Sequence, residues 1–352
     1  MRFLVIGLFF MAACKPSQRA SVSADAVKPT VITEKSGFDT DDPAIWINKA
    51  DPAASLVIGT DKETGGGLYA YDLKGKIVRK VVGLQRPNNV DIAYGFKLGD
   101  RLVDLAICTE RGTSSLRFYS LPDLLEVDGG GLPVFQDETE RQPMGIAVYQ
   151  PPGTSIVQLI VGRKSGPTSS YLWQYQLGEE NGKLFMKPIR RFGQYSGKKE
   201  IESIAVDNEL GYVYYSDEQF GIRKYYADPS KGDEELALFG QGHFREDNEG
   251  ISIYKTAEGK GYILVSDQSA NTFNVYRREG EAGNPNQHDR LAAVPVSTHQ
   301  SDGSEVTNVA LPGYPQGLFV AMSDDRTFQY YNWQDIAVRI ANSAAGITAV
   351  VK

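Results

Sequence analysis

The sequence is poor in the side chains that most often carry thiol and imidazole chemistry, with two cysteines and three histidines among its 352 residues. Cys108 ends the apolar run 105–108, which is typical of a strand interior, so we interpret it as a small buried residue. The Cys-x5-Arg spacing of thiol phosphatases fails because Ser114 stands where the arginine would be needed. His243, His288 and His299 do not lie in a metal-ligand spacing, and no Arg-His-Gly motif of histidine acid phosphatases occurs. These absences argue against a cysteine or histidine nucleophile and against a zinc or copper site.

A surplus of basic residues is also lacking. The formal net charge is −7, and the lysines and arginines are scattered along the chain rather than clustered. Binding to a phosphate backbone or to an anionic membrane surface needs concentrated positive charge. We therefore expect neither nucleic acid nor an anionic lipid surface as a partner.

The most apolar run, Phe3–Ala13, is about half as long as the roughly 20 residues that a membrane-spanning helix needs. It follows Arg2 and has the layout of a secretory signal peptide. Residues 11–14, Met-Ala-Ala-Cys, resemble a bacterial lipobox, in which the cysteine is acylated after cleavage. We predict a signal peptide of the lipoprotein type over residues 1–13, lipidation of Cys14 and a flexible tether over 14–29. The alternative is an ordinary signal peptide with an incidental cysteine.

This prediction has two consequences. The protein is exported and anchored to a bacterial membrane, facing the periplasm or the cell surface, with the lipid on Cys14 as its membrane contact. Cys108 then has no partner for an intramolecular disulfide.

What the sequence does contain is a unit that recurs six times. In each unit a short apolar run is followed by a second run, a polar turn and a third strand that ends in tyrosine. The closing tyrosines lie about fifty residues apart: Tyr71, Tyr119, Tyr175, Tyr225, Tyr276 and Tyr330. A period near fifty built from short alternating strands is the signature of a β-propeller, and 36 glycines and 17 prolines fit its many turns. We predict an all-β, six-bladed propeller over residues 30–352, with four-stranded antiparallel blades around a central channel, as a single domain.

Charged residues recur at two positions of this unit. Acidic residues near the start of the first strands should converge on the axis, where they repel one another unless a counter-charge is present; they are Asp42, Asp91, Glu202, Glu249 and Glu305. The ends of the second strands carry Lys62, Arg111 and Arg163-Lys164 in the first three units. The last three units carry mostly carboxylates there, among them Glu218. One face should therefore hold hard cations on one side and anionic groups on the other.

Oxygen ligands with almost no histidine or cysteine favour Ca²⁺. Lysine and arginine opposite bound Ca²⁺ suit a polyanion, and phosphate is the best candidate. Metals that bridge a phosphate and a water remove the need for a protein nucleophile.

Two motifs carry a resemblance to a known family. Residues 39–46, Asp-Thr-Asp-Asp-Pro-Ala-Ile-Trp, and 88–94, Asn-Asn-Val-Asp-Ile-Ala-Tyr, closely resemble the signature motifs of the β-propeller phytases. The resemblance continues through 198–207, 247–251, 259–262 and 314–320, and it covers about residues 30–340. It implies a monomeric, calcium-dependent 3-phytase that binds several Ca²⁺ ions. Such an enzyme hydrolyses phytate (myo-inositol hexakisphosphate) or calcium-phytate and releases inorganic phosphate by attack of a calcium-bridged water, with no phosphoenzyme intermediate.

The resemblance also implies roles for individual residues. The metal ligands would be Asp42, Glu202, Glu218, Asp247, Glu249 and Asp302. Of these, the catalytic residues that hold the attacking water would be Glu202, Glu218, Glu249 and Asp302. The phosphate-binding cations would be Lys62, Arg111 and either Arg163 or Lys164, because the segment 162–166 is one residue longer than the family pattern. Asn89 and Asp91 would support the site without reaching the substrate.

Three positions depart from the family pattern. Ala93 replaces a basic residue, Met144 stands where a substrate-side tyrosine is expected, and Glu63 takes the place of a second lysine. These departures bear on rate and substrate preference.

Two other functions were weighed against the sequence. A sugar-lactonase-like propeller with one axial metal does not account for the cations recurring in the first three units. A surface-anchored binding propeller without catalysis does not account for an acidic channel that needs metal for stability.

Overall fold

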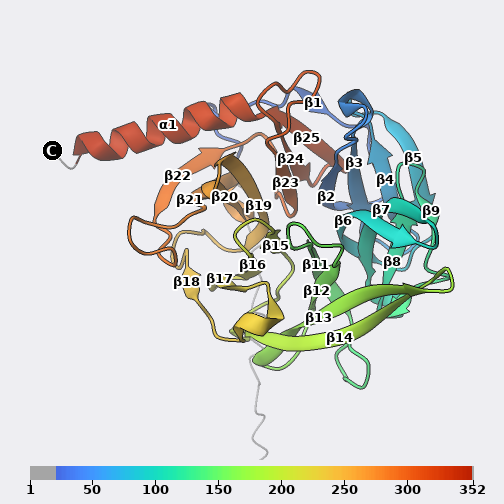
Figure 1. Ribbon diagram of the computed structural model, residues 1–352. Coiled ribbons are helices and arrows are strands. Elements are labelled where there is room, and N and C mark those ends of the chain that lie inside the picture. Colours follow the sequence, from blue (N-terminus) through green and yellow to red (C-terminus); the bar gives the residue numbers. More distant parts are fainter. Residues whose placement is uncertain (1–20, 351–352) are drawn as a thin grey trace, which may run out of the picture.

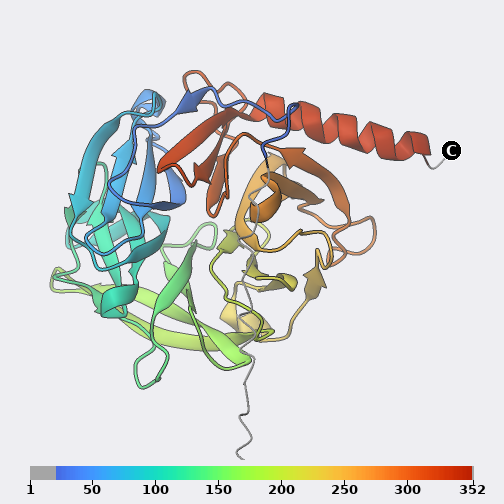
Figure 2. The same ribbon diagram turned by 180° about the vertical axis from the view of Figure 1, so that it is seen from behind.

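The computed structural model describes residues 21–350, with side chains described as far as residue 343. Six β-sheets stand in a ring around a central axis (Figure 1). Figure 2 shows the same ring from behind. Five sheets take all of their strands from one repeat, and the sixth takes three strands from its repeat and one from the start of the described chain, so each repeat is a blade. The predicted six-bladed β-propeller is confirmed. The expected signal peptide, Cys14 and the first part of the expected tether lie outside the described residues.

The first three blades follow the chain from the axis outward. Blade one contains β2 (Thr40–Trp46), β3 (Leu56–Asp61), β4 (Gly67–Tyr71) and β5 (Ile77–Val82). Blade two contains β6 (Pro87–Leu98), β7 (Arg101–Glu110) and β8 (Ser115–Ser120), with the short strands β9 (Leu125–Glu126) and β10 (Leu132–Pro133) both paired to β8. Blade three contains β11 (Pro143–Tyr149), β12 (Gln158–Arg163), β13 (Ser169–Glu180) and β14 (Lys183–Gln194).

The last three blades repeat this order. Blade four contains β15 (Ile204–Asp207), β16 (Tyr212–Asp217), β17 (Gly221–Tyr226) and β18 (Ala237–Phe239). Blade five contains β19 (Asn248–Ala257), β20 (Lys260–Asp267), β21 (Thr272–Arg277) and β22 (Arg290–Pro295). Blade six contains β23 (Ser304–Thr307), β24 (Leu318–Ser323), β25 (Thr327–Asn332) and, as its outer strand, β1 (Val31–Ile32). Short 3-10 turns lie at Pro52–Ala54, Arg111–Thr113, Pro229–Lys231 and Gln268–Ala270.

The recurring tyrosines pack between blades. All six lie in the third strand of their blade and are buried. Tyr71 of blade one meets the edge of Phe328 in blade six with ring centroids 5.8 Å apart, and Tyr225 of blade four meets Phe192 of blade three at 5.5 Å. Large rings that fill the wedge between two twisted sheets explain why tyrosine recurs at this position.

The ring closes through the start of the described chain. Val31 and Ile32 pair antiparallel with Tyr330 and Gln329, so β1 supplies the outer edge of blade six. Residues 26 and 27, within the segment expected to be a tether, also lie against the propeller. Val27 is buried and forms a bridge with Val296, and its backbone N–H donates to the Pro295 carbonyl at 2.9 Å.

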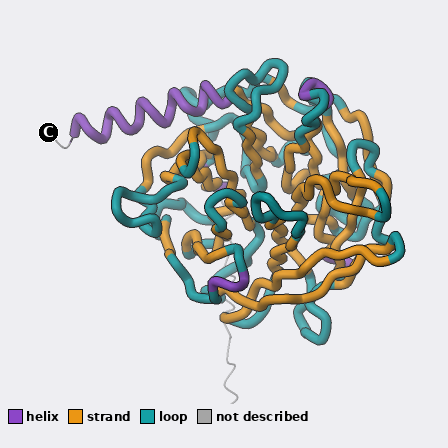
Figure 3. Tube along the Cα trace, viewed as in Figure 1, coloured by secondary structure: helices purple, strands orange, loops and turns teal. Residues whose placement is uncertain are grey.

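The chain ends in an α-helix that the sequence analysis did not predict. Helix α1 (Trp333–Val350) follows β25 directly and projects beyond the rim of the ring, where Figure 3 shows it in purple. Trp333 is buried and stacks on Tyr254, with ring centroids 3.5 Å apart. Ile336 and Ile340 are buried against the same side of blade five and blade six. No helix within residues 21–350 is long and apolar enough to cross a membrane.

Candidate active site

The charged residues gather at one end of the ring, where inner strands begin and second strands end. The inner strands β2, β6, β11 and β19 all show a shift in pairing register near their first residues. An extra residue at such a shift bends the strand and re-aims its side chains. In this protein four blades use the same irregularity to present polar groups at one end of the axis.

Glycines allow the blades to meet closely at this end. A Cβ atom on Gly145 would lie 2.1 Å from the backbone carbonyl oxygen of Glu202, and one on Gly250 would lie 2.4 Å from that of Asp302. No side chain fits these positions without moving the neighbouring backbone. The glycines therefore fix how near the segments that carry Glu202 and Asp302 come to the adjacent blade.

Two clusters of three acidic side chains each form the acidic half of the site. The first triad consists of Glu200, Glu202 and Glu218, and the second triad of Glu218, Asp247 and Glu249; within each triad the carboxylate oxygens lie within 4.8 Å of one another. Glu218 follows β16 and belongs to both triads, whereas Glu249 lies in β19. Asp247 and Glu249 meet at one triad, although Asp247 precedes β19 and a shift in pairing register lies across Glu249.

Some oxygens of these carboxylates have no hydrogen-bond partner. Glu218 Oε1 and Glu249 Oε2 are buried without a hydrogen bond. Burial raises the pKa of Glu218 to about 8. Burial, reinforced by the neighbouring Glu218 carboxylate, also holds the pKa of Glu249 well above its usual range. A site of fixed, unpaired carboxylate oxygens has the donor set that a hard divalent cation requires, so these residues fit a metal ion.

Lys199 lies inside the second triad. Its Nζ is 2.7 Å from Glu218 Oε2, 2.7 Å from Asp247 Oδ2 and 3.7 Å from Glu249 Oε1. Burial works to lower the pKa of Lys199, but the carboxylates of Glu249 and Glu218 outweigh it and raise that pKa above the usual value. Lys199 is therefore a charged ammonium among carboxylates.

A second lysine, Lys62, contacts carboxylates of its own blade one and of the adjacent blade six. Lys62 Nζ is 2.7 Å from Asp302 Oδ2, 2.9 Å from Asp41 Oδ1 and 3.7 Å from Asp39 Oδ2. Burial raises the pKa of Asp41 to about 6 in spite of the ammonium of Lys62. The side-chain amide of Asn88 donates to both Asp41 and Glu202, which links this group to the first triad.

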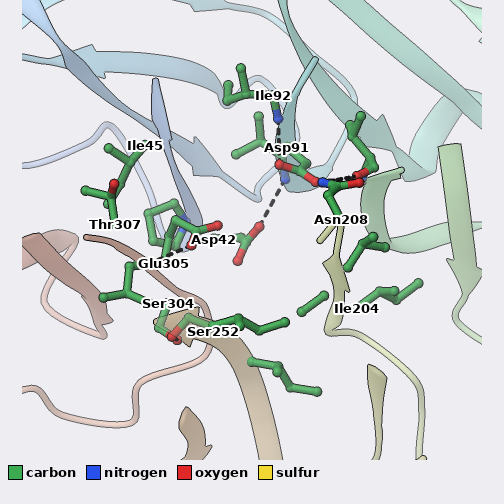
Figure 4. Close-up of a pocket in the computed structure, with 18 of the residues that line it drawn as sticks. Asp42, Ile45, Asp91, Ile92, Ile204, Asn208, Ser252, Ser304, Glu305 and Thr307 are labelled. Atoms are coloured by element: carbon green, nitrogen blue, oxygen red, sulfur yellow. Dashed lines mark hydrogen bonds between the residues drawn. The ribbon is translucent and has the colours of Figure 1, made fainter. Parts of the chain in front are cut away.

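Asp42 lies elsewhere than the family resemblance implied. Its carboxylate faces the axial channel together with Asp91 and Glu305 (Figure 4). Its Oδ2 accepts a hydrogen bond from the backbone N–H of Val90 at 3.1 Å. These residues line a cavity of about 320 Å³. It is the preceding residue, Asp41, that joins the cluster of lysines and carboxylates.

The expected cations differ in exposure. Arg163 is buried, with its guanidinium 3.2 Å from Glu138 Oε2 and over the ring of Phe135. Lys164 has a side chain that is 46% exposed and contacts Glu200 Oε2 at 2.9 Å. Of the two alternatives, Lys164 is the one that reaches the carboxylate site.

Arg111 and the three departures from the family pattern also have definite places. Arg111 is buried, and its Nη1 lies 3.2 Å from Met144 Sδ. Met144 thus covers the guanidinium with a thioether. Ala93 is buried in the core between blades two and three, whereas Glu63 is exposed beside Lys62.

Three residues of the site were missed from the sequence. Asp41 stands in the first signature motif, but the resemblance implied the adjacent Asp42 as the metal ligand. Lys199 and Glu200 precede the inner strand β15 in a loop, where no repeat position marks them. The signal that could have found them is the run Lys198-Lys199-Glu200 immediately before Glu202.

Comparison with known proteins adds to this geometry. The model of a family described as Phytase matches residues 5–340. The 3-phytase of Bacillus subtilis (strain 168) is 30% identical over 327 residues, which cover 86% of this chain and 81% of that protein. Among solved structures, one titled "Crystal Structure of Mitotic Checkpoint Complex" aligns with a TM-score of 0.50 at 9% identity, covering 94% of this chain and 98% of the other. That last likeness is one of fold alone.

Proposed function

This chain belongs to the phytase family, and we propose on that premise that it hydrolyses phytate in a calcium-dependent reaction without a phosphoenzyme intermediate. It is a phosphoric monoester hydrolase of the 3-phytase kind. The proposed calcium dependence rests on the two triads that share Glu218, in which buried carboxylate oxygens are left unpaired. No other arrangement among the described residues places so many oxygen donors beside exposed lysines.

Calcium is favoured because the donors are all oxygens and come from separate loops. Ca²⁺ accepts six to eight oxygen ligands in flexible geometry. When bound, Ca²⁺ would offset the charge on phosphate oxygens and make a water molecule more acidic. Glu202, Glu218, Asp247 and Glu249 would hold it, with Glu200 as a further donor.

The substrate is a polyanion, so several cations should meet it. Lys62 and Lys164 are both held by carboxylates. Lys62 contacts Asp302 and Asp41, and Lys164 contacts Glu200 of the first triad. A phosphate that enters between them would exchange these carboxylate contacts for phosphate contacts. Arg111 would act from beneath Met144 through its fixed charge, and Arg163 would shape the loop that carries Lys164.

The described residues supply no competing nucleophile at this site. Burial raises the pKa of the Cys108 thiol, which keeps it protonated inside the core of blades one and two. His288 is buried beside Lys224, and burial lowers its pKa to about 4. Direct attack by water, positioned by Glu202 and Glu218, fits this arrangement.

The proposal includes export of a monomer that is anchored through a lipid on Cys14. It is supported by the apolar run Phe3–Ala13 and by the lipobox-like residues 11–14.

The test is release of inorganic phosphate from phytate by the purified protein, with Ca²⁺ and with excess EDTA. We expect release only with Ca²⁺, and we expect Glu202→Gln to lose about 100-fold or more in turnover while the protein stays folded, as for removal of a preorganised electrostatic group. Glu258→Gln, an exposed site at a distant turn, is the matched control. Equal release in EDTA would contradict the calcium requirement, and no release by folded protein with Ca²⁺ would contradict the substrate.

A further inference from the structure

We propose that Lys199 is an internal cation that fills the second triad in the metal-free protein and must be displaced when a metal binds, so that it sets the metal affinity of the site. The inference rests on the proposed function, because it concerns the same carboxylates. It assigns a role to a residue outside the expected ligands and phosphate-binding cations.

The first argument is position. Lys199 Nζ contacts two of the three triad carboxylates at 2.7 Å and the third at 3.7 Å. These are the oxygens that a metal would draw together at about 2.3–2.6 Å. An ammonium and a divalent cation do not fit between the same oxygens, because each would lose its ligands to the other and the two charges would repel.

The second argument is the difference in freedom between the lysine and the carboxylates. The Lys199 side chain is 36% exposed, whereas those of Glu218, Asp247 and Glu249 are 0%, 14% and 3% exposed. Lys199 lies in the loop between β14 and β15, outside either strand. The ammonium can therefore swing into water while the carboxylates stay in place.

The third argument comes from the neighbouring lysine. Lys198 Nζ donates to the Gln219 carbonyl oxygen at 3.0 Å and lies over the ring of Phe220. It carries the same charge one residue away, but its ammonium contacts this carbonyl and this ring instead of the triad carboxylates. The contact of Lys199 with the triad is therefore specific to its position in the loop, and Lys198 provides a matched control.

Two effects follow from removing the Lys199 charge. The metal-free protein loses the cation that compensates three buried carboxylates, so it becomes less stable. The metal no longer has to displace an ammonium, so it binds more tightly. A unit charge within about 4 Å of the metal position implies a gain in affinity of about tenfold or more.

The experiment compares wild type, Lys199→Met and Lys198→Met by calorimetric titration with Ca²⁺ and by thermal melting in EDTA and in saturating Ca²⁺. We expect Lys199→Met to bind Ca²⁺ at least about tenfold more tightly than Lys198→Met, and to melt lower in EDTA, with the deficit reduced by Ca²⁺. Equal affinities of the two variants would overturn the inference and leave the calcium requirement intact. Absence of Ca²⁺ binding by all three proteins would overturn both.

A second comparison separates the direct contact from a general effect of charge. In an Asp247→Asn background the second triad is already impaired, so Lys199→Met should change Ca²⁺ affinity much less than it does in wild type. An unchanged effect would mean that Lys199 acts through the overall field rather than by occupying the triad, and it would overturn the inference.

Discussion

At the scale of residues, the acidic side chains near the axis differ in what lies beside them. Glu218 and Asp247 contact Lys199, and Asp302 contacts Lys62. Glu305 instead faces the channel, where its Oε1 accepts a hydrogen bond from the backbone N–H of Val306 at 2.6 Å. Burial, together with the nearby carboxylate of Asp91, raises the pKa of Glu305 to about 8. The fold therefore favours the protonated form of this side chain.

This difference predicts a pH dependence of stability. The folded-state pKa of Glu305 lies above the usual value of 4.5, so its contribution to stability is fully present below about pH 4.5 and is lost as pH rises through about 8. Glu305→Gln cannot ionise. In excess EDTA, the variant should match wild type near pH 5 and melt about 2–4 °C higher near pH 9.

Thermal melting across this pH range checks the prediction, with Glu258→Gln as an exposed control. Parallel pH profiles for wild type and Glu305→Gln would contradict it, because they would show that Glu305 ionises equally in the folded and unfolded chains.

The choice between Asp41 and Asp42 shows where sequence reasoning on this site ends. In a regular strand adjacent side chains point to opposite faces, so one of the two must face the channel. The pairing of β2 with β3 shifts between Thr40 and Pro43, and this shift lies across both aspartates. Counting alternate residues through such a shift does not assign a face. Glu202, Glu218, Asp247 and Glu249 do come together in the two triads. Motif and repeat position both marked Glu202 and Glu249, whereas repeat position alone marked Glu218 and a motif alone marked Asp247.

At the scale of elements, α1 stands apart because it projects beyond the ring of blades. Its contact with the propeller depends on one stripe of apolar side chains: Trp333, Ile336 and Ile340 are buried, whereas Val338 is 52% exposed. The spacing of three and four residues along this stripe is typical of an amphipathic helix. The helix was missed because the propeller repeat was extended to the end of the chain, although this spacing was present in the sequence.

The helix contact can be tested with one substitution. Trp333→Ala removes a buried ring that stacks on Tyr254, and such truncations cost about 3–5 kcal/mol in other proteins. We expect a clear drop in the free energy of unfolding by chemical denaturation. Val338→Ala on the exposed side of the same helix should change it by less than about 0.5 kcal/mol. Equal effects of the two variants would show that α1 does not pack as described.

At the scale of the whole molecule, charge is distributed unevenly. The chain has a net charge of −7, and both triads and the carboxylates around Lys62 converge on one end of the axis. The ring architecture was predictable from the period of the tyrosines, because each blade carries one of them in its third strand, where it packs against a neighbouring blade. The cations that balance the acids were only partly predictable, because Lys199 lies in a loop outside the repeat.

Convergence of acids predicts that metal removal affects stability as well as activity. An ion bound by the folded state alone stabilises that state by mass action. We expect the melting temperature of wild type to fall by several degrees in excess EDTA and to return when Ca²⁺ is restored. Mg²⁺ at the same concentration should restore less, because it demands shorter, octahedral coordination. A melting temperature that EDTA leaves unchanged would contradict binding of calcium to the folded protein.

The pairing of β1 with β25 has a consequence for how the chain reaches this state. Thr33 and Phe328, which hydrogen-bond beside this pairing, are 295 residues apart. The strand that completes blade six is thus synthesised nearly 300 residues before its partner. Contacts of such long range slow folding, because the loop between them must be closed before they form. Until then β25 presents an open edge to which a second chain could add. Pairing of β1 with β25 therefore also protects the protein from adding a second chain at this edge.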